Sequence, residues 1–158
     1  MELKSIGTIY TPYKNNDAPF QPLQHTENDE FYIELKEEYV EGLKDLETLK
    51  YIYLLYYLDQ NQEKKDLTVK TPWSDKEIGL FATRSPNRIN SIGLSVVELL
   101  KIEANRIYIS SLDAFNGTPL LDIKPYMKDL DTKDDADHGW LEENDFEHLQ
   151  LHIDGKTH

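Results

Sequence analysis

The sequence predicts a mainly β protein, either a sandwich or a barrel, and three observations favour this class. Short apolar runs rich in β-branched and aromatic residues recur along the chain. Polar turns that contain Gly, Pro, Asn and Asp separate these runs. The 3.6-residue periodicity of amphipathic helices is weak. Many short strands divided by turn signals are typical of all-β sandwiches and barrels.

The first part of the chain contains two predicted strands and a long loop. Residues 3–10 fit a first strand, which Thr11–Tyr13 ends. Residues 14–30 are polar and contain prolines, so we expect a loop, because proline fixes its own φ and keeps the preceding residue out of the helical region. Phe31–Leu35 predicts a second strand, and the charged segment Glu37–Leu46 predicts a short helix or turn.

The segment Leu49–Leu58 is almost continuously apolar and aromatic. It predicts a central strand covered on both faces, because such strands show continuous rather than alternating hydrophobicity. A buried helix is the alternative, since periodicity does not separate the two in a short run. Its tyrosines are expected in the core or in an interface, with one of them facing a pocket as the alternative, and a buried hydroxyl group needs a hydrogen-bond partner. They are Tyr51, Tyr53, Tyr56 and Tyr57.

The remaining apolar runs predict further strands, and the chain then becomes acidic. Residues 127–158 form an acidic C-terminal tail that we expect to be partly ordered, with an alternating segment at Leu149–Ile153 that fits a last strand. The predicted strands before the tail are Leu67–Val69, Ile78–Ala82, Leu94–Leu100, Ile107–Leu112 and Leu120–Ile123.

Length and composition indicate one soluble domain that spans residues 1–158. The absence of cysteine excludes disulfides, thiolate metal sites and cysteine nucleophiles, and it suits the cytosol. No apolar run approaches the ~20 residues that span a membrane, and the first residues lack the apolar region of a signal peptide. We therefore expect a cytoplasmic protein without a membrane segment.

The net charge of −13 argues against a nucleic-acid partner, because phosphate contacts need clustered Lys and Arg. The distribution of charge weakens this argument. Residues 129–154 carry ten acidic residues and one lysine, whereas residues 64–128 carry ten basic and seven acidic residues. The acidic excess therefore lies mostly in the tail, and the segment before it is mildly basic.

Two polar turns within residues 79–126 are candidate binding loops, since loops on a rigid scaffold often carry function. In the first, Arg84 and Arg88 lie four residues apart, and their guanidinium groups could bind a carboxylate or a phosphate. Salt bridges to acidic neighbours are the alternative. In the second, Asp113 to Pro119, the Asn-Gly pair explains a chain reversal by itself. Its Asp and Asn side chains could also bind ribose hydroxyls or an adenine edge.

Metal sites and common catalytic motifs are not indicated. Of the five histidines, His148 and His152 have a spacing that puts them on one face, but no third ligand accompanies them. The chain contains no Gly-x-Gly-x-x-Gly fingerprint, Walker lysine loop, Gly-x-Ser-x-Gly elbow or His-Glu-x-x-His motif. We expect no bound metal.

Two long motifs resemble signatures of one family. Residues 79–95, Gly-Leu-Phe-Ala-Thr-Arg-Ser-Pro-Asn-Arg-Ile-Asn-Ser-Ile-Gly-Leu-Ser, resemble Gly-x-Phe-Ala-Thr-Arg-Ser-Pro-x-Arg-Pro-Asn-Pro-Ile-Gly-Leu-Ser. Residues 113–126 resemble Asp-x-x-Asp-Gly-Thr-Pro-x-x-Asp-Ile-Lys-Pro-Tyr. Both signatures belong to the TsaA-like (YaeB-like) family, whose characterised members are tRNA methyltransferases. The likeness extends to Ile6–Tyr13 and Gly139–Leu141 and covers nearly the whole chain, in the short form without a C-terminal domain.

This resemblance implies a fold, an activity and an assembly. It implies a small β-barrel built on a single sheet, with short helices. It also implies a homodimer that holds its cofactor, S-adenosylmethionine, near the subunit interface. The implied reaction is methylation of threonylcarbamoyl-adenosine next to the anticodon of tRNA. The alternatives are a non-catalytic module that binds S-adenosylmethionine or adenosine, and a methyltransferase that acts on a small molecule or a protein.

The resemblance also implies the cofactor-binding residues. Departures from the family pattern occur at Phe20, where Arg is usual, at Ile89 and Ser91, where prolines are usual, at Asn116 in place of an acid, and at Tyr51 in place of a common His. No catalytic base is evident, and the candidate catalytic residues are Arg84, Arg88 and Asn90. The expected cofactor-binding residues are Gln21, Pro22, Leu23, Asp59, Gln60, Arg84, Leu94, Asp113, Ala114, Phe115 and Asn116.

Overall fold

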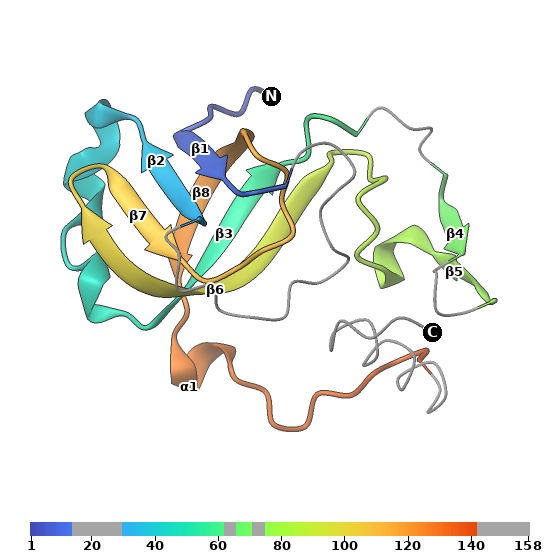
Figure 1. Ribbon diagram of the computed structural model, residues 1–158. Helices are drawn as coiled ribbons and strands as arrows, with labels where there is room; N and C mark the ends of the chain where they lie inside the picture. Colours follow the sequence, from blue (N-terminus) through green and yellow to red (C-terminus); the bar gives the residue numbers. More distant parts are fainter. Residues whose placement is uncertain (14–29, 62–65, 71–74, 142–158) are drawn as a thin grey trace.

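Six antiparallel strands form one sheet that closes into a barrel, shown in a computed structural model that describes residues 1–13, 30–61, 66–70 and 75–141 (Figure 1). Their order is β1-β2-β7-β6-β3-β8, and β8 pairs with β1 as well as with β3. The mainly β prediction is confirmed. The strands are β1 Gly7–Tyr10, β2 Tyr32–Leu35, β3 Tyr51–Tyr57, β6 Ile92–Glu103, β7 Arg106–Ile109 and β8 Thr118–Pro125.

A second, smaller sheet consists of β4 (Thr68–Lys70) and β5 (Glu77–Gly79), which lie beside the barrel in Figure 1. Helical structure in the described residues is limited to short segments. The expected short helix after β2 is present as a 3-10 helix, Glu37–Leu43. The other 3-10 helices are Leu46–Thr48 and Leu80–Ala82, and the α-helix α1 is Lys128–Asp131.

Strand β3 is the central strand that its sequence predicts, because it pairs with both β6 and β8. The expectation that both of its faces are covered is wrong. Ile52, Leu54 and Tyr56 point inward and are buried, whereas Tyr51 and Tyr57 on the other face are exposed. The run is continuously apolar because its outward face is also apolar. Tyr51 is 40% exposed and Tyr57 44% exposed, although the ring of Tyr126 packs against Tyr51.

Most predicted strands differ from the observed ones in their bounds. Strand β1 begins at Gly7 rather than at residue 3, and β8 runs from Thr118 to Pro125 rather than from Leu120 to Ile123. The segment Ile78–Ala82 is only partly a strand, because β5 ends at Gly79 and a 3-10 turn follows. Strand β6 is longer than predicted, since it continues past a bulge between Leu99 and Lys101. Strand β7 is shorter than its apolar run, and the rest of that run leads toward the Asp113 turn.

The core fills the inside of the barrel with inward-facing residues from every barrel strand. Alternation along each strand places every second side chain inside, which is the pattern expected for a sheet with one buried face. The largest fully buried side chains within the barrel strands are Ile9, Ile33, Ile52, Leu54, Val97, Ile107, Ile109 and Leu120.

One end of the barrel gathers the polar loops, and we call it the loop end. Strands β1 and β3 stop there, while β6 and β8 begin there. Backbone hydrogen bonds join these segments, from Leu58 N–H to the Ser91 carbonyl at 2.9 Å and from Gly117 N–H to the Ile9 carbonyl at 2.9 Å. Residues far apart in the sequence are thus held side by side.

The described part of the acidic tail folds back toward the polar loops. After α1, the chain runs toward the side of the molecule that carries β4 and β5 (Figure 1). There the indole Nε1–H of Trp140 donates a 2.7 Å hydrogen bond to the Ala82 carbonyl. The predicted strand Leu149–Ile153 lies outside the described residues.

Candidate functional site

Three polar side chains meet at the loop end of the barrel. The Tyr56 hydroxyl group, which reaches this end from β3, lies 2.8 Å from the Ser95 Oγ on β6. It also donates a longer bond of 3.5 Å to the Asp113 Oδ1. Tyr56 is only 4% exposed. This end of the barrel thus carries a cluster of two hydroxyl groups and one carboxyl group.

Burial changes the proton affinities of this cluster. It raises the pKa of Tyr56 to about 12, and the negative charge of Asp113 adds to the rise. Burial also raises the pKa of the Asp113 carboxyl group above its ordinary value of 3.8. Hydrogen bonds from the backbone and from Tyr56, together with the positive charge of Arg84, act in the opposite direction on Asp113. The Tyr56 hydroxyl group therefore stays protonated well above neutral pH and serves as a hydrogen-bond donor to Asp113.

The absence of a side chain at Gly93 makes room for the Tyr56 ring. The two residues are paired across β3 and β6. A Cβ atom at position 93 would lie 2.2 Å from the Cε2 of Tyr56 and 2.7 Å from two further ring atoms. Glycine at this position therefore sets the orientation that brings the phenol to Ser95 and Asp113.

The turn from Asp113 to Thr118 is fastened to the end of β1. The Thr11 backbone N–H donates a 3.1 Å bond to the Asn116 Oδ1, and the Thr11 hydroxyl group donates to the Ala114 carbonyl at 2.7 Å. Gly117 adopts φ +88, which the turn requires. Because the oxygen of Asn116 accepts this bond, a carboxylate at the same position could accept it as well. The departure at Asn116 therefore preserves the turn.

The two arginines of the first loop have different surroundings. The Arg88 Nη1 donates to the backbone carbonyl groups of Thr83 at 2.7 Å, Leu80 at 3.3 Å and Ser85 at 3.5 Å. This side chain therefore holds the loop in shape. Arg84 is exposed, and within the described chain it makes no hydrogen bond or ion pair, although its charge acts on Tyr56 and Asp113. It is the more available of the two for an anionic ligand.

The backbone of Ser91 departs from what the family signature allows. Ser91 is buried and has φ +46, in the left-handed region. Its hydroxyl group donates a 3.0 Å bond to the Arg88 carbonyl. Proline cannot adopt a positive φ, so the proline usual at this position would not fit the loop as it is folded here.

The other expected cofactor residues lie around the same end or outside the described residues. Asp59 and Gln60 are exposed just after β3. Leu94 points outward from β6 and is 49% exposed. The segment Gln21–Leu23 lies outside the described residues. Ala114 is buried and Phe115 is half-buried, beside Asn116 in the turn already described.

Sequence reasoning did not assign Tyr56 or Ser95 to the site. The sequence does contain a signal for Tyr56. Alternation along β3 places this tyrosine inside the barrel, where its hydroxyl group needs a hydrogen-bond partner. For Ser95 the signal was weaker, since its role depends on the cross-strand register, which brings it beside the phenol. Neither residue stands out by type alone.

The fold and this site define a class: a small β-barrel protein whose loop end combines a carboxylate, two hydroxyl groups and an available arginine. Such a set suits a ligand that has both hydroxyl groups and an anionic group. The family model for the tRNA-methyltransferase O N-terminal domain matches residues 8–132. The chain belongs to this family.

Two similar proteins of Archaeoglobus fulgidus are each 43% identical to this chain. One, a "Probable S-adenosyl-L-methionine-binding protein", matches 90% of the chain, which spans only 38% of that relative's length. The other, an "S-adenosyl-L-methionine-binding protein", matches 83% of the chain and 93% of its own length. The "tRNA (adenine(37)-N6)-methyltransferase" of Escherichia coli is 33% identical and matches 85% of the chain and 61% of its own length.

A solved structure supports the same grouping. The "Crystal structure of TrmO" is 36% identical, with a TM-score of 0.72, and the match covers 88% of this chain and 63% of that one. Among the described residues, no helix has the length and apolar character needed to cross a bilayer, and no three potential metal ligands lie together.

Proposed function

We propose that this protein is a methyltransferase that uses S-adenosylmethionine and acts on threonylcarbamoyl-adenosine next to the anticodon of tRNA. The family domain covers most of the chain, and the E. coli relative carries the name of a methyltransferase for adenine 37 of tRNA. Two further relatives carry names that specify S-adenosylmethionine binding. The proposal places the protein in the cytoplasm with tRNA and calls for neither a membrane nor a metal ion.

The observation that carries this proposal is the cluster of Tyr56, Ser95 and Asp113 beside the exposed Arg84. A carboxylate accepts hydrogen bonds from ribose hydroxyl groups, and an exposed guanidinium group binds a carboxylate. The chain therefore offers partners for both ends of the proposed cofactor. We assign the adenosine end to the Asp113–Asn116 turn and the anionic end to Arg84. Asp59, Gln60, Leu94 and the segment Gln21–Leu23 complete the proposed set.

In the proposed reaction, the main tasks of the chain are to position the two reactants and to exclude water from them. When bound, S-adenosylmethionine supplies an activated methyl group on its sulfonium. The chain must hold the acceptor nitrogen in line with that methyl group and exclude water. Arg84 is placed to bind an anionic group, Arg88 to keep the loop rigid, and Asn90, exposed in the same loop, to contact the acceptor.

We also propose that the protein works as a homodimer. The outward face of β6 carries Ile92, Leu94 and Val96, all exposed. Strand register places them directly beside Tyr57, Leu55 and Tyr53 of β3. An exposed, contiguous apolar patch of this kind marks an interaction surface. Because Leu94 is one of the proposed cofactor residues, contact between two copies here would bring the site close to the interface.

The test of the activity is tritiated methyl transfer to tRNA from cells that lack the modification. The expected result is incorporation that depends on tRNA. Calorimetry would accompany it, with Arg84→Ala expected to weaken S-adenosylmethionine binding at least tenfold. Cofactor binding without incorporation would reject the enzyme and favour the binding module. Unchanged affinity of Arg84→Ala would reject this placement of the anionic end.

A further inference from the structure

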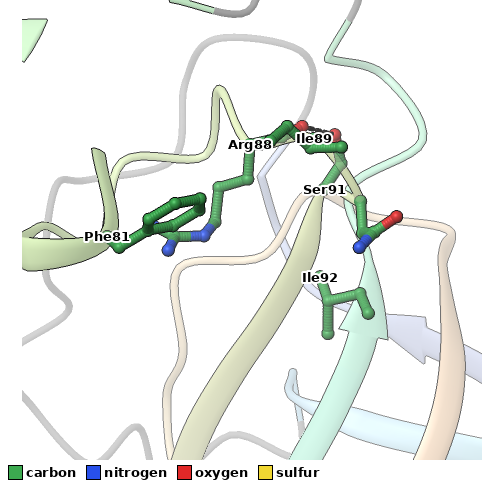
Figure 2. A pocket seen from close by; sticks show the side chains of 6 residues that line it. Phe81, Arg88, Ile89, Ser91 and Ile92 are labelled. Atoms are coloured by element: carbon green, nitrogen blue, oxygen red, sulfur yellow. Dashed lines mark hydrogen bonds between the residues drawn. The ribbon is translucent and has the colours of Figure 1, made fainter. Parts of the chain in front are cut away.

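A pocket on the arginine loop is not used by the cofactor contacts proposed above. It has a volume of about 340 Å³ and lies where the loop meets the start of β6. Figure 2 shows the Arg88 side chain reaching toward Phe81, with Ile92 on the strand below. This volume is at the small end for ligand sites and suits one flat ring system. Its lining residues are Phe81, Arg88, Ile89, Asn90, Ser91 and Ile92.

We propose that this pocket holds the base of the acceptor nucleotide, stacked on Phe81; this proposal rests on the proposed function. Phe81 is 77% exposed, although it belongs to a short 3-10 turn, Leu80–Ala82, whose first residue is buried. An aromatic ring held out in solvent by an ordered turn is a platform on which a nucleobase can stack.

Arg88 gives the pocket a rigid second wall. Its Nη1 is bonded to three backbone carbonyl groups of the same loop, so the guanidinium plane is fixed before any ligand arrives. Planar guanidinium groups stack on aromatic rings and on bases. Less side-chain entropy is then lost when the base enters.

The polar edge and the surrounding charge suit a nucleotide. Asn90 is exposed at the rim, and its amide group can both donate to and accept from the edge of a base. Arg84 is exposed four residues before Arg88, and residues 64–128 carry a net positive charge in a chain that is otherwise acidic. A phosphate group attached to the bound nucleotide would therefore meet favourable charge here.

The pocket also has the right neighbours for an acceptor site. Arg84 lies between Phe81 and Arg88 in the sequence, and Leu94 follows Ile92 by two residues on β6. Both flanking residues belong to the proposed cofactor set. The same loop would then contact both the base in this pocket and the proposed methyl donor. In-line transfer requires the two to lie close together.

The test compares Phe81→Leu, which keeps an apolar side chain but loses the ring face, with Phe81→Tyr, which keeps the ring. The control is Leu130→Ala, an exposed apolar residue on α1. The substrate is an anticodon stem-loop RNA with the modified adenosine. Phe81→Leu is expected to raise the KM for RNA about five- to hundredfold, the range of one lost base stack. The Kd for S-adenosylmethionine should stay within twofold, and Phe81→Tyr should restore the KM.

A second measurement separates this proposal from the proposed function. RNA with 2-aminopurine in place of the acceptor base should lose fluorescence on the wild-type protein, because stacking quenches it, and keep it on Phe81→Leu. Quenching of the 2-aminopurine RNA, together with no methyl transfer to the RNA that carries the modified adenosine, would support the pocket and reject the enzyme. If Phe81→Leu transfers methyl groups with the same KM for RNA as the wild-type protein, the pocket proposal is rejected and the proposed enzyme activity is not. A changed cofactor Kd, or a changed sedimentation mass, would overturn the proposal in favour of a cofactor or subunit contact.

Discussion

At the scale of single residues, Asp113 is both a proposed ligand-binding group and a partly buried carboxylate that lowers the stability of the fold at neutral pH. Its carboxyl group is half-buried, and burial raises its pKa. The fold thus favours the protonated form more than the unfolded chain does. Stability from this group is fully present below the ordinary pKa of 3.8 and is lost as the pH rises through the raised value. At neutral pH the partly buried carboxylate is charged, which costs folding free energy. A ligand that donates hydrogen bonds to it would offset this cost.

Asp113→Asn should therefore raise the melting temperature at pH 7, and this gain should shrink as the pH falls toward 4. The substitution removes the buried charge while keeping the size of the side chain. It should also weaken S-adenosylmethionine binding, because an amide is a poorer acceptor for hydroxyl groups than a carboxylate. Thermal melts across this pH range and calorimetry would measure both effects. A lower melting temperature at pH 7 would show that Arg84 and Tyr56 outweigh the cost of burial.

Gly93→Ala should lower the free energy of unfolding by about 1–3 kcal/mol, the usual cost of forcing an extra methyl group into a packed site. The new Cβ would overlap the Tyr56 ring and disturb its bond to Ser95. The matched control is Gly79→Ala, because an added Cβ there meets nothing within 4 Å. Urea unfolding of both variants is the measurement, and equal stability would show that the ring can move aside freely.

Residue types alone could predict that the first loop binds an anion, but not which arginine is available for it. Arg84 and Arg88 are equivalent in the sequence. Only the folded loop shows that Arg88 is bonded to three carbonyl groups while Arg84 stays exposed. The same limit applies to Ser95, whose role depends on register. The turn chemistry of the Asn-Gly pair was local and was predicted correctly, with Gly117 at positive φ.

At the scale of elements, the arginine loop is supported from outside by the tail. The Trp140 indole bonds to the Ala82 carbonyl across 58 positions of sequence. Ala82 ends the 3-10 turn that carries Phe81, and Arg84 follows two residues later. The tail thus helps to place the loop as well as carrying acidic charge.

Trp140→Phe should leave the melting temperature nearly unchanged but loosen the loop, because it removes one N–H donor worth about 0.5–1.5 kcal/mol and keeps the aromatic ring. Hydrogen exchange at the Thr83 amide should become faster, and S-adenosylmethionine binding should weaken a fewfold. Tyr126→Phe is the control, since it removes a tail hydrogen bond to Thr132 that does not involve the loop. Identical exchange at Thr83 in both variants would contradict this supporting role.

Element types were easier to predict than element faces. Every barrel strand overlaps an apolar run, because β-branched and aromatic residues mark strands by composition. The error at β3 came from reading its continuous apolar run as burial on two faces. Tyr57 is instead exposed beside the exposed apolar residues of β6, and Tyr51 is exposed on the same face. An exposed apolar face has the same composition as a face covered by the chain itself.

At the scale of the whole molecule, that apolar face should decide the oligomeric state. Val96→Arg is expected to convert a dimer into a monomer in sedimentation equilibrium, because Val96 is 48% exposed within the patch and a buried unpaired charge is strongly disfavoured. Leu67→Arg is the control, as Leu67 is exposed just before β4, away from the barrel face. A dimer that persists in Val96→Arg would place the interface elsewhere.

Closure of the barrel also governs how the chain can fold during synthesis. Strand β1 finds its partner β2 early, but its other edge waits for β8, more than one hundred residues later. At about 5–20 residues per second, a ribosome needs roughly 5–20 s to supply that strand. Until then β1 keeps an unpaired edge of the kind that recruits other chains. The first four residues of the barrel are thus the earliest made, yet they are fully paired only after β8 has been made.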